Sequence, residues 1–201
     1  MIKGRMSYLL ISFLSMIYIT GCGYAYYQTI KQPSIKSDPI RSNKIFYVKP
    51  IDLSKINYKD LGYEKKSVWK KETANLPKDY IKCFPDLLKR EGIAKKKVYM
   101  LKRKARAKKG ILVRVIVEKI ILNWNAWSNK PDQFFCKIVF TKASNGKKLF
   151  SGDFEVNNRS GNFLAQSYGM TMSARMYNAA NNIAWVVTKI MANGIADPDK
   201  Y

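Results

Sequence analysis

The residues of this chain best suited to chemistry are its three cysteines, Cys22, Cys83 and Cys136, and the chain contains no histidine. Without an imidazole the chain lacks the base of Ser-His-Asp and Cys-His nucleophilic systems and a common metal ligand. The sequence also contains no CxxC pair, no glycine-rich phosphate loop and no serine elbow. We therefore expect no catalytic residue, no metal site and no cofactor, and predict that the protein is not an enzyme.

Cys22 ends a segment with the layout of a bacterial export signal. Lys3 and Arg5 give it a positive start, and residues 6–19 are apolar and uncharged. As a helix this stretch would rise roughly 21 Å, which is short of the ~30 Å of a bilayer core. Its end, Ile19-Thr20-Gly21-Cys22, resembles the lipobox of bacterial lipoproteins, which implies cleavage after Gly21 and attachment of a diacylglyceryl group to the Cys22 thiol. The alternative is an uncleaved anchor with a chance cysteine.

The lipobox resemblance also implies a location. It predicts a signal peptide over residues 1–21 and an envelope protein that is held to the membrane by the lipids on Cys22. Gly23 stands where an Asp marks inner-membrane retention in enteric bacteria. We therefore expect the protein at the outer membrane, facing the periplasm.

The chain is strongly basic, with 37 Lys and Arg against 14 Asp and Glu. Only Lys3 and Arg5 precede Cys22, so residues 22–201 carry a net charge of +21. In an exported protein this charge predicts contact with anionic lipid or polymer and no contact with nucleic acid, although a solvated basic surface is an equal alternative. The densest basic run is residues 95–109. Within this run, the residues that we expect to bind an anionic surface are Lys102, Arg103, Lys104, Arg106, Lys108 and Lys109.

Cys83 and Cys136 are the cysteines that remain once Cys22 is assigned to the lipid. Outside the cytoplasm a disulfide between them would persist, and closing so long a loop stabilises a domain by about 4 kcal/mol in the chain-entropy model. Two separate buried thiols are the alternative, because a free cysteine packs as a small apolar residue. The sequence leaves both possibilities open.

Two further pairs of residues are candidates for contact with a partner or with each other. Trp124 and Trp127 lie in a polar connection, where they either contact a partner or pack over the edge of a sheet. Arg114 and Glu118 are four residues apart on a predicted strand, so they share a face and could pair. Neither pair amounts to an active site.

The pattern of residues 22–201 predicts a tether followed by one domain. Residues 22–43 lack periodicity and contain two prolines, so we expect a flexible tether with a reach of roughly 25 Å. Residues 44–201 alternate strand-like and helix-like segments, with a hairpin turn at Asn145-Gly146 and a break at Pro85 within the first long helix. We predict a single α+β domain in which a mostly antiparallel sheet of about four to five strands carries two main helices on one face.

Four segments carry a resemblance to known families: IFYVKP, ILVRVIVEKIIL, SNGKKLFSG and the Ala-rich final helix. Across residues 44–193 this layout is similar to small uncharacterised periplasmic lipoproteins, and more distantly to curli-secretion and penicillin-binding-protein-activator lipoproteins. Those families have no catalytic signature, so the resemblance implies a binding or assembly role. We predict a non-enzymatic accessory lipoprotein that binds an envelope protein or polymer. Direct binding of anionic lipid or lipopolysaccharide by the basic face is the alternative, and the oligomeric state is left open.

Overall fold

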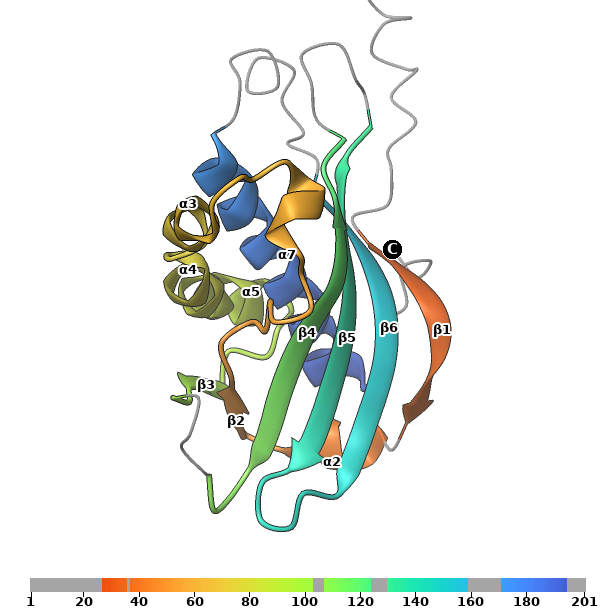
Figure 1. The fold of residues 1–201 in the computed structure, drawn as a ribbon. Coiled ribbons are helices and arrows are strands. Elements are labelled where there is room, and N and C mark those ends of the chain that lie inside the picture. Colours follow the sequence, from red (N-terminus) through yellow and green to blue (C-terminus); the bar gives the residue numbers. More distant parts are fainter. Residues whose placement is uncertain (1–26, 36, 103–106, 124–129, 159–170, 195–201) are drawn as a thin grey trace, which may run out of the picture.

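The computed structural model describes residues 27–35, 37–102, 107–123, 130–158 and 171–194, which are coloured in Figure 1. Within this part of the chain, one twisted sheet packs against helices. The predicted signal peptide over residues 1–21, the predicted lipid site Cys22 and the tryptophans Trp124 and Trp127 lie outside the described residues.

The described strands form one six-stranded sheet in the order β1-β6-β5-β4-β2-β3. Three long antiparallel strands make its centre: β4 (Ile111–Ile121), β5 (Asp132–Lys142) and β6 (Lys148–Asn158). The short strands β2 (Ile45–Val48) and β3 (Lys97–Met100) run parallel to β4 at one side. The α+β class and the mostly antiparallel sheet are confirmed, while the predicted four to five strands fall short of the six observed.

The additional strand comes from the segment that we expected to be a tether. β1 (Tyr27–Ile35) pairs antiparallel with β6, and α2 (Ser37–Ser42) follows it. The prediction of a flexible tether over residues 22–43 is therefore wrong for these two elements. The register of β1 shifts between Thr29 and Lys31 and again before Ser34, so the strand has no regular alternation to detect. Pro33 is tolerated there because β1 is an edge strand.

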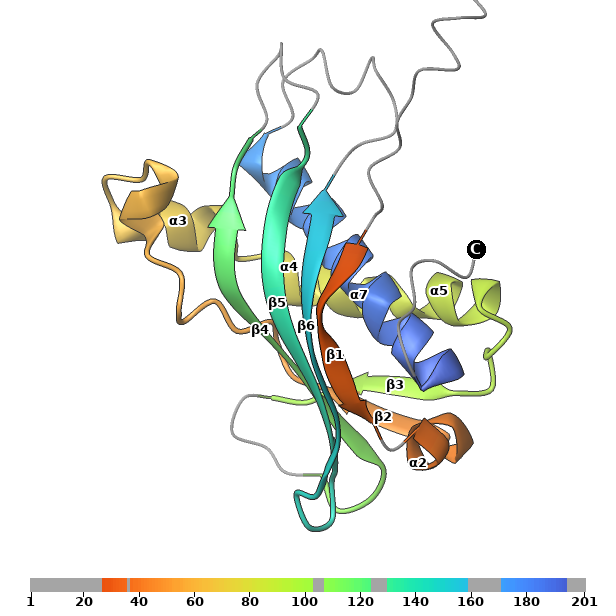
Figure 2. The same cartoon turned by 90° about the vertical axis from the view of Figure 1, so that its right-hand side faces the viewer.

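The helices differ in number from the prediction. α7 (Met172–Asn193) is the longest and lies against β6, while α4 (Leu76–Lys82) and α5 (Phe84–Arg90) pack on α7 (Figures 1 and 2). α4 and α5 are the two halves of one predicted helix, which separates at Cys83 because Pro85 cannot continue the hydrogen bonding of α4. The described part of the chain also contains α3 (Lys66–Glu72) and the 3₁₀ turn η1 (Tyr58–Leu61), so the expected arrangement of two main helices on one face is not confirmed.

The core lies between the sheet and α7. One face of the β5–β6 hairpin contributes to this core, because Phe140, Phe150 and Phe154 are fully buried. Phe140 packs edge-on against Phe150, with ring centroids 5.6 Å apart. The hairpin turns at Gly146, whose φ of 70° lies in the left-handed region that glycine adopts without strain. This sheet and its helices position the side chains that line two hollows at the molecular surface.

Candidate functional site

A groove of about 430 Å³ lies beside β4, between residues 49–54 and α3. β2 ends at Val48, yet the chain that follows stays beside β4 because backbone hydrogen bonds hold it there. These bonds run from Lys49 N to Val113 O at 3.0 Å, from Asp52 N to Val115 O at 2.9 Å and from Val117 N to Asp52 O at 2.9 Å. Residues 49–52 therefore cover the edge of β4 that the short β2 leaves open.

Four cationic residues line this groove, which we call the cationic groove: Lys49, Lys66, Lys70 and Arg114. Lys66 and Lys70 are one turn apart on α3 and share a face of that helix. α3 is anchored by the buried Trp69, which packs edge-on against Tyr63 with ring centroids 5.4 Å apart. Arg114 is exposed on β4. Among the described residues, the side chains of Lys66, Lys70 and Arg114 have no ion-pair partner.

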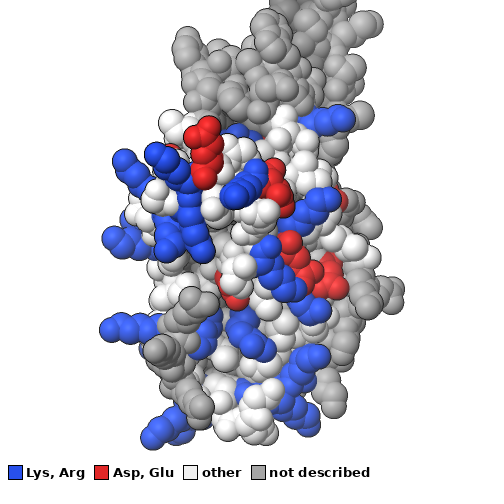
Figure 3. All heavy atoms as spheres, viewed as in Figure 1, with Lys and Arg blue, Asp and Glu red and all other residues white. Residues whose placement is uncertain are grey.

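The remaining lining of the cationic groove is mostly aliphatic and includes Ile51, Leu53 and Ile116. Its one carboxylate among the described lining residues is Asp52, whose Oδ1 accepts a hydrogen bond from Ser54 N at 2.9 Å. Figure 3 shows Lys and Arg side chains gathered over α3 and along the strands of this face, with fewer Asp and Glu among them. The groove therefore combines an apolar wall with an excess of positive charge.

No local pattern in the sequence indicates the cationic groove. The available signal was the pair Lys66 and Lys70, which are four residues apart with no acid between them. Nothing local connects that pair to Arg114, because the strand that carries Arg114 lies more than forty residues further along the chain. Only the packing of α3 beside β4 brings the three cations to one groove.

A second hollow of about 540 Å³ lies along the far half of β4. There Lys55 Nζ donates a hydrogen bond to Glu118 Oε1 at 2.6 Å, and both side chains are exposed. The pairing of Arg114 with Glu118 that the sequence allowed is thus not formed. Four residues along a strand span roughly 13 Å, which is too far for an ion pair.

The predicted basic cluster lies in the connection from β3 to β4. Lys102, Lys108 and Lys109 are exposed, whereas Arg103, Lys104 and Arg106 lie outside the described residues. The structure thus places half of this cluster at the surface. Lys102, Lys108 and Lys109 are not among the described residues that line the cationic groove.

One lysine of the same basic run has a structural role. Lys96 Nζ donates to the carbonyl oxygens of Arg41 at 2.6 Å and Asn43 at 2.7 Å, and lies 3.4 Å from that of Ile40. Its ammonium also lies 5.2 Å from the centroid of the Phe46 ring. Partial burial lowers the pKa of Lys96. Lys96 therefore holds the C-terminal end of α2 against the sheet and is not available to a surface ligand.

The predicted disulfide between Cys83 and Cys136 is not formed. Both thiols are free and buried, and each lies against a backbone carbonyl oxygen of its own segment of the chain. Cys83 Sγ lies 3.1 Å from Asp79 O on α4, and Cys136 Sγ lies 3.6 Å from Phe134 O on β5. Burial raises the pKa of Cys83 to about 11 and raises that of Cys136 still further. Both cysteines thus behave as small apolar core residues, which was the alternative prediction.

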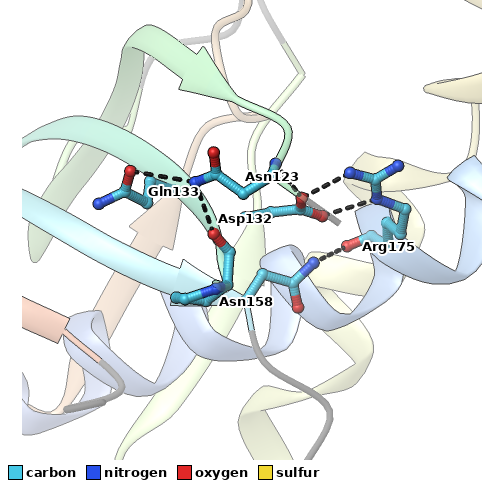
Figure 4. A network of polar contacts seen from close by, with 6 residues as sticks. Asn123, Asp132, Gln133, Asn158 and Arg175 are labelled. Atoms are coloured by element: carbon cyan, nitrogen blue, oxygen red, sulfur yellow. Dashed lines mark hydrogen bonds and ion pairs between the residues drawn. The ribbon is translucent and has the colours of Figure 1, made fainter. Parts of the chain in front are cut away.

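Polar side chains join the end of β4 and the start of β5 to α7, as Figure 4 shows. Arg175 of α7 donates from Nε and Nη2 to the two carboxylate oxygens of Asp132, at 2.6 and 2.5 Å. Asp132 also accepts from Asn123 N at 3.0 Å, and Asn158 Nδ2 donates to Arg175 O at 2.7 Å. These bonds tie three strands to one helix, so we assign them a structural role.

No group of three or more His, Cys, Asp or Glu side chains in the described part of the chain is placed to hold a metal ion. Likewise, none of the described helices has the length and apolar character needed to cross a bilayer.

Comparison with known proteins yields distant structural likeness only. No family model matches the chain, and no curated protein matches its sequence. Among solved structures the chain is similar to the PelC dodecamer from Paraburkholderia phytofirmans, with 13% identity and a TM-score of 0.39, covering 75% of this chain and 97% of that one. A crystal form of a single-substitution variant of the same protein gives 13% identity, a TM-score of 0.35 and coverage of 76% and 97%.

Proposed function

We propose that this chain is a lipoprotein of the bacterial cell envelope, anchored through Cys22, that acts as a non-enzymatic accessory module binding an envelope protein or polymer. The observation that carries the proposal is the sequence Ile19-Thr20-Gly21-Cys22 after an apolar stretch too short to span a bilayer. The outer membrane, on its periplasmic side, is the proposed location.

The position of β1 determines which end of the sheet would lie near the membrane. Only residues 23–26 separate Cys22 from Tyr27, the first residue of β1, so the two Cα atoms are at most about 18 Å apart. Tyr27 pairs with Val156 near the end of β6, where β4 ends and β5 begins. A lipid on Cys22 would therefore hold this end of the sheet close to the membrane.

The anchor is tested by replacing Cys22→Ala in the full chain and following incorporation of labelled palmitate and separation of membrane from soluble fractions. We expect loss of the label and release from the membrane. Cys83→Ala is the matched control, because it removes a thiol outside the lipobox and should leave labelling intact. Labelling that persists in the Cys22→Ala variant would contradict the proposal.

The accessory role needs a second experiment. Crosslinking in intact cells, followed by identification of the captured species, should recover an envelope protein or polymer from cells with the intact protein. The amount of this captured partner should be lower in cells with the Cys22→Ala variant, because the released domain is no longer held at the membrane. Equal capture from both cell types would argue against a role that depends on anchoring.

Direct binding of anionic lipid or lipopolysaccharide by the basic face is the second candidate function, favoured by the exposure of Lys102, Lys108 and Lys109. This segment leads into Ile111, at the end of β4 opposite to the end beside Tyr27. The strand between them is roughly 33 Å long, so an upright anchored domain holds these lysines away from its own membrane. Replacing Lys102, Arg103, Lys104 and Arg106 with Gln should weaken salt-sensitive binding to anionic vesicles if this candidate is correct, and unchanged binding would exclude it.

A further inference from the structure

We propose that the cationic groove binds the anionic groups, carboxylate or phosphate, of a saccharide polymer. This names a ligand class for the binding module proposed above and rests on that proposal for the compartment in which the polymer is met. The residues assigned to binding are Lys66, Lys70 and Arg114, and Lys49 lines the same groove.

The first argument is electrostatic. Like charges four residues apart on a helix destabilise it, and Lys66 and Lys70 have this spacing on the short α3. Arg114 adds a third positive charge to the same groove from β4. No described carboxylate forms an ion pair with any of the three. An anionic ligand would relieve this repulsion and would gain charge-assisted hydrogen bonds from the same groups.

The second argument concerns the kind of ligand. One recurring way to bind an extended peptide is to add it as a strand to an open sheet edge. At this groove the edge of β4 is already occupied, because Lys49 N and Asp52 N donate to β4 carbonyls and Val117 N donates to Asp52 O. Strand addition is therefore closed to a ligand at this groove, and binding relies on charge and side-chain contact, which a saccharide polymer with anionic substituents can supply.

The third argument is size and lining. A volume of about 430 Å³ is in the range of sites for organic ligands and exceeds what a lone inorganic anion fills. The aliphatic side chains of Ile51, Leu53 and Ile116 offer an apolar wall. The C–H face of a sugar ring fits such a wall while its carboxylate or phosphate reaches the cations that line the same groove.

Binding is measured by calorimetry on the full-length lipidated protein in phosphatidylcholine nanodiscs, whose headgroups add no net charge. The probes are oligogalacturonate as the carboxylate source, a maltooligosaccharide phosphorylated on its sugar hydroxyls as the phosphate source, and a neutral maltooligosaccharide of equal length. A polyglutamate peptide of matched charge represents the acidic-protein class. We expect one or both anionic polymers to bind and the neutral one not to bind.

The groove is tested with the triple variant Lys66→Gln, Lys70→Gln, Arg114→Gln. The charge-matched control replaces three exposed lysines of the β5–β6 hairpin, Lys142→Gln, Lys147→Gln and Lys148→Gln. We expect the groove variant to lose tenfold or more in affinity, because each charged hydrogen bond contributes on the order of a tenfold change. The control should lose less than about twofold, as for positions without a specific contact. Arg114→Lys, which keeps the charge, should retain most of the binding.

Each outcome is decisive. Equal weakening by the groove variant and the control would mean attraction by net charge alone and would overturn the site. Tighter binding of polyglutamate than of either saccharide would overturn the ligand class, and binding of no anionic probe would overturn the proposal. Far-UV circular dichroism of each variant confirms folding. None of these results bears on palmitate labelling at Cys22, so failure of the groove and failure of the anchor are distinguishable.

Discussion

Arg175 near the start of α7 and Asp132 at the start of β5 form a two-pronged ion pair that is almost completely buried. The exposed fractions of the two side chains are 11% and 2%. The pair joins residues forty-three positions apart and lies where β4, β5 and β6 meet the helix. A buried ion pair of this kind is costly to break because the remaining charge is left in a poorly solvated place.

Asp132→Asn should therefore lower the free energy of unfolding by about 3–5 kcal/mol. Urea unfolding followed by circular dichroism measures this change. Lys137→Gln is the control, since its partner Asp153 lies 3.8 Å away and both side chains are partly exposed. An exposed pair contributes only about 0–1 kcal/mol, so equal losses in the two variants would contradict the structural role assigned to Asp132.

A second buried pair links the end of α5 to α7. Glu91 accepts from Lys189 Nζ at 2.9 Å and from Trp185 Nε1 at 3.1 Å, and the exposed fractions of Lys189 and Glu91 are 6% and 9%. Glu91→Gln should destabilise the fold by about 3 kcal/mol and shift the fluorescence of Trp185. Thermal unfolding and emission spectra measure the two effects.

Lys55→Gln is the matched control for Glu91→Gln, because its bond to Glu118 is at the surface. It should change stability by less than about 1 kcal/mol. The double variant Glu91→Met, Lys189→Met should lose less than the single change, since it removes both charges together. A double variant less stable than Glu91→Gln would show that the charges are not the source of the effect.

The buried thiols predict a pH dependence. The pKa of Cys83 is raised to about 11 in the folded protein, whereas an unfolded cysteine ionises near 8.5. The folded state therefore keeps this proton between about pH 8.5 and 11 while the unfolded state loses it. The resulting stability is fully present below pH 8.5 and is lost as the pH rises through this window.

Urea unfolding between pH 8 and 11 should thus show a steeper fall in stability for the parent protein than for Cys83→Ala. At pH 8 in the folded protein, Cys83 and Cys136 should resist alkylation by iodoacetamide and should react after unfolding. Non-reducing mass spectrometry should find both as thiols. A mass that corresponds to a Cys83–Cys136 bridge, or rapid alkylation of the native protein, would refute this account.

The contacts of Lys96 predict a local loss of structure. Lys96→Met removes the charged donor to the partly exposed carbonyls of Arg41 and Asn43 and should cost about 1–3 kcal/mol, because hydrogen bonds that involve a charged group are stronger than neutral ones. Hydrogen exchange should show faster opening of α2 before the rest of the fold. Lys95→Met is the neighbouring control, since Lys95 is exposed and its loss should be nearly neutral. Similar exchange in the two variants would remove the role given to Lys96.

Local sequence signals determined much of the core of this protein. A long β-branched run beginning at residue 110 indicated β4, and apolar residues that share a face indicated the two hairpin strands β5 and β6. Asn145-Gly146 located the hairpin turn, and Pro85 located the separation of α4 from α5. These features depend on backbone preferences and burial within a few residues, so a single sequence carries them.

Only the tertiary structure decided which distant segments meet. β1 enters the sheet through backbone bonds to β6 that need no regular side-chain pattern, so its sequence looked like a tether. The thiols of Cys83 and Cys136 are both buried as predicted, but their directions depend on how α4 and β5 pack. Lys66, Lys70 and Arg114 form one groove because α3 lies beside β4, which is a relation between elements. Contacts between residues far apart in the chain follow from how whole faces pack, and that information is absent from local periodicity.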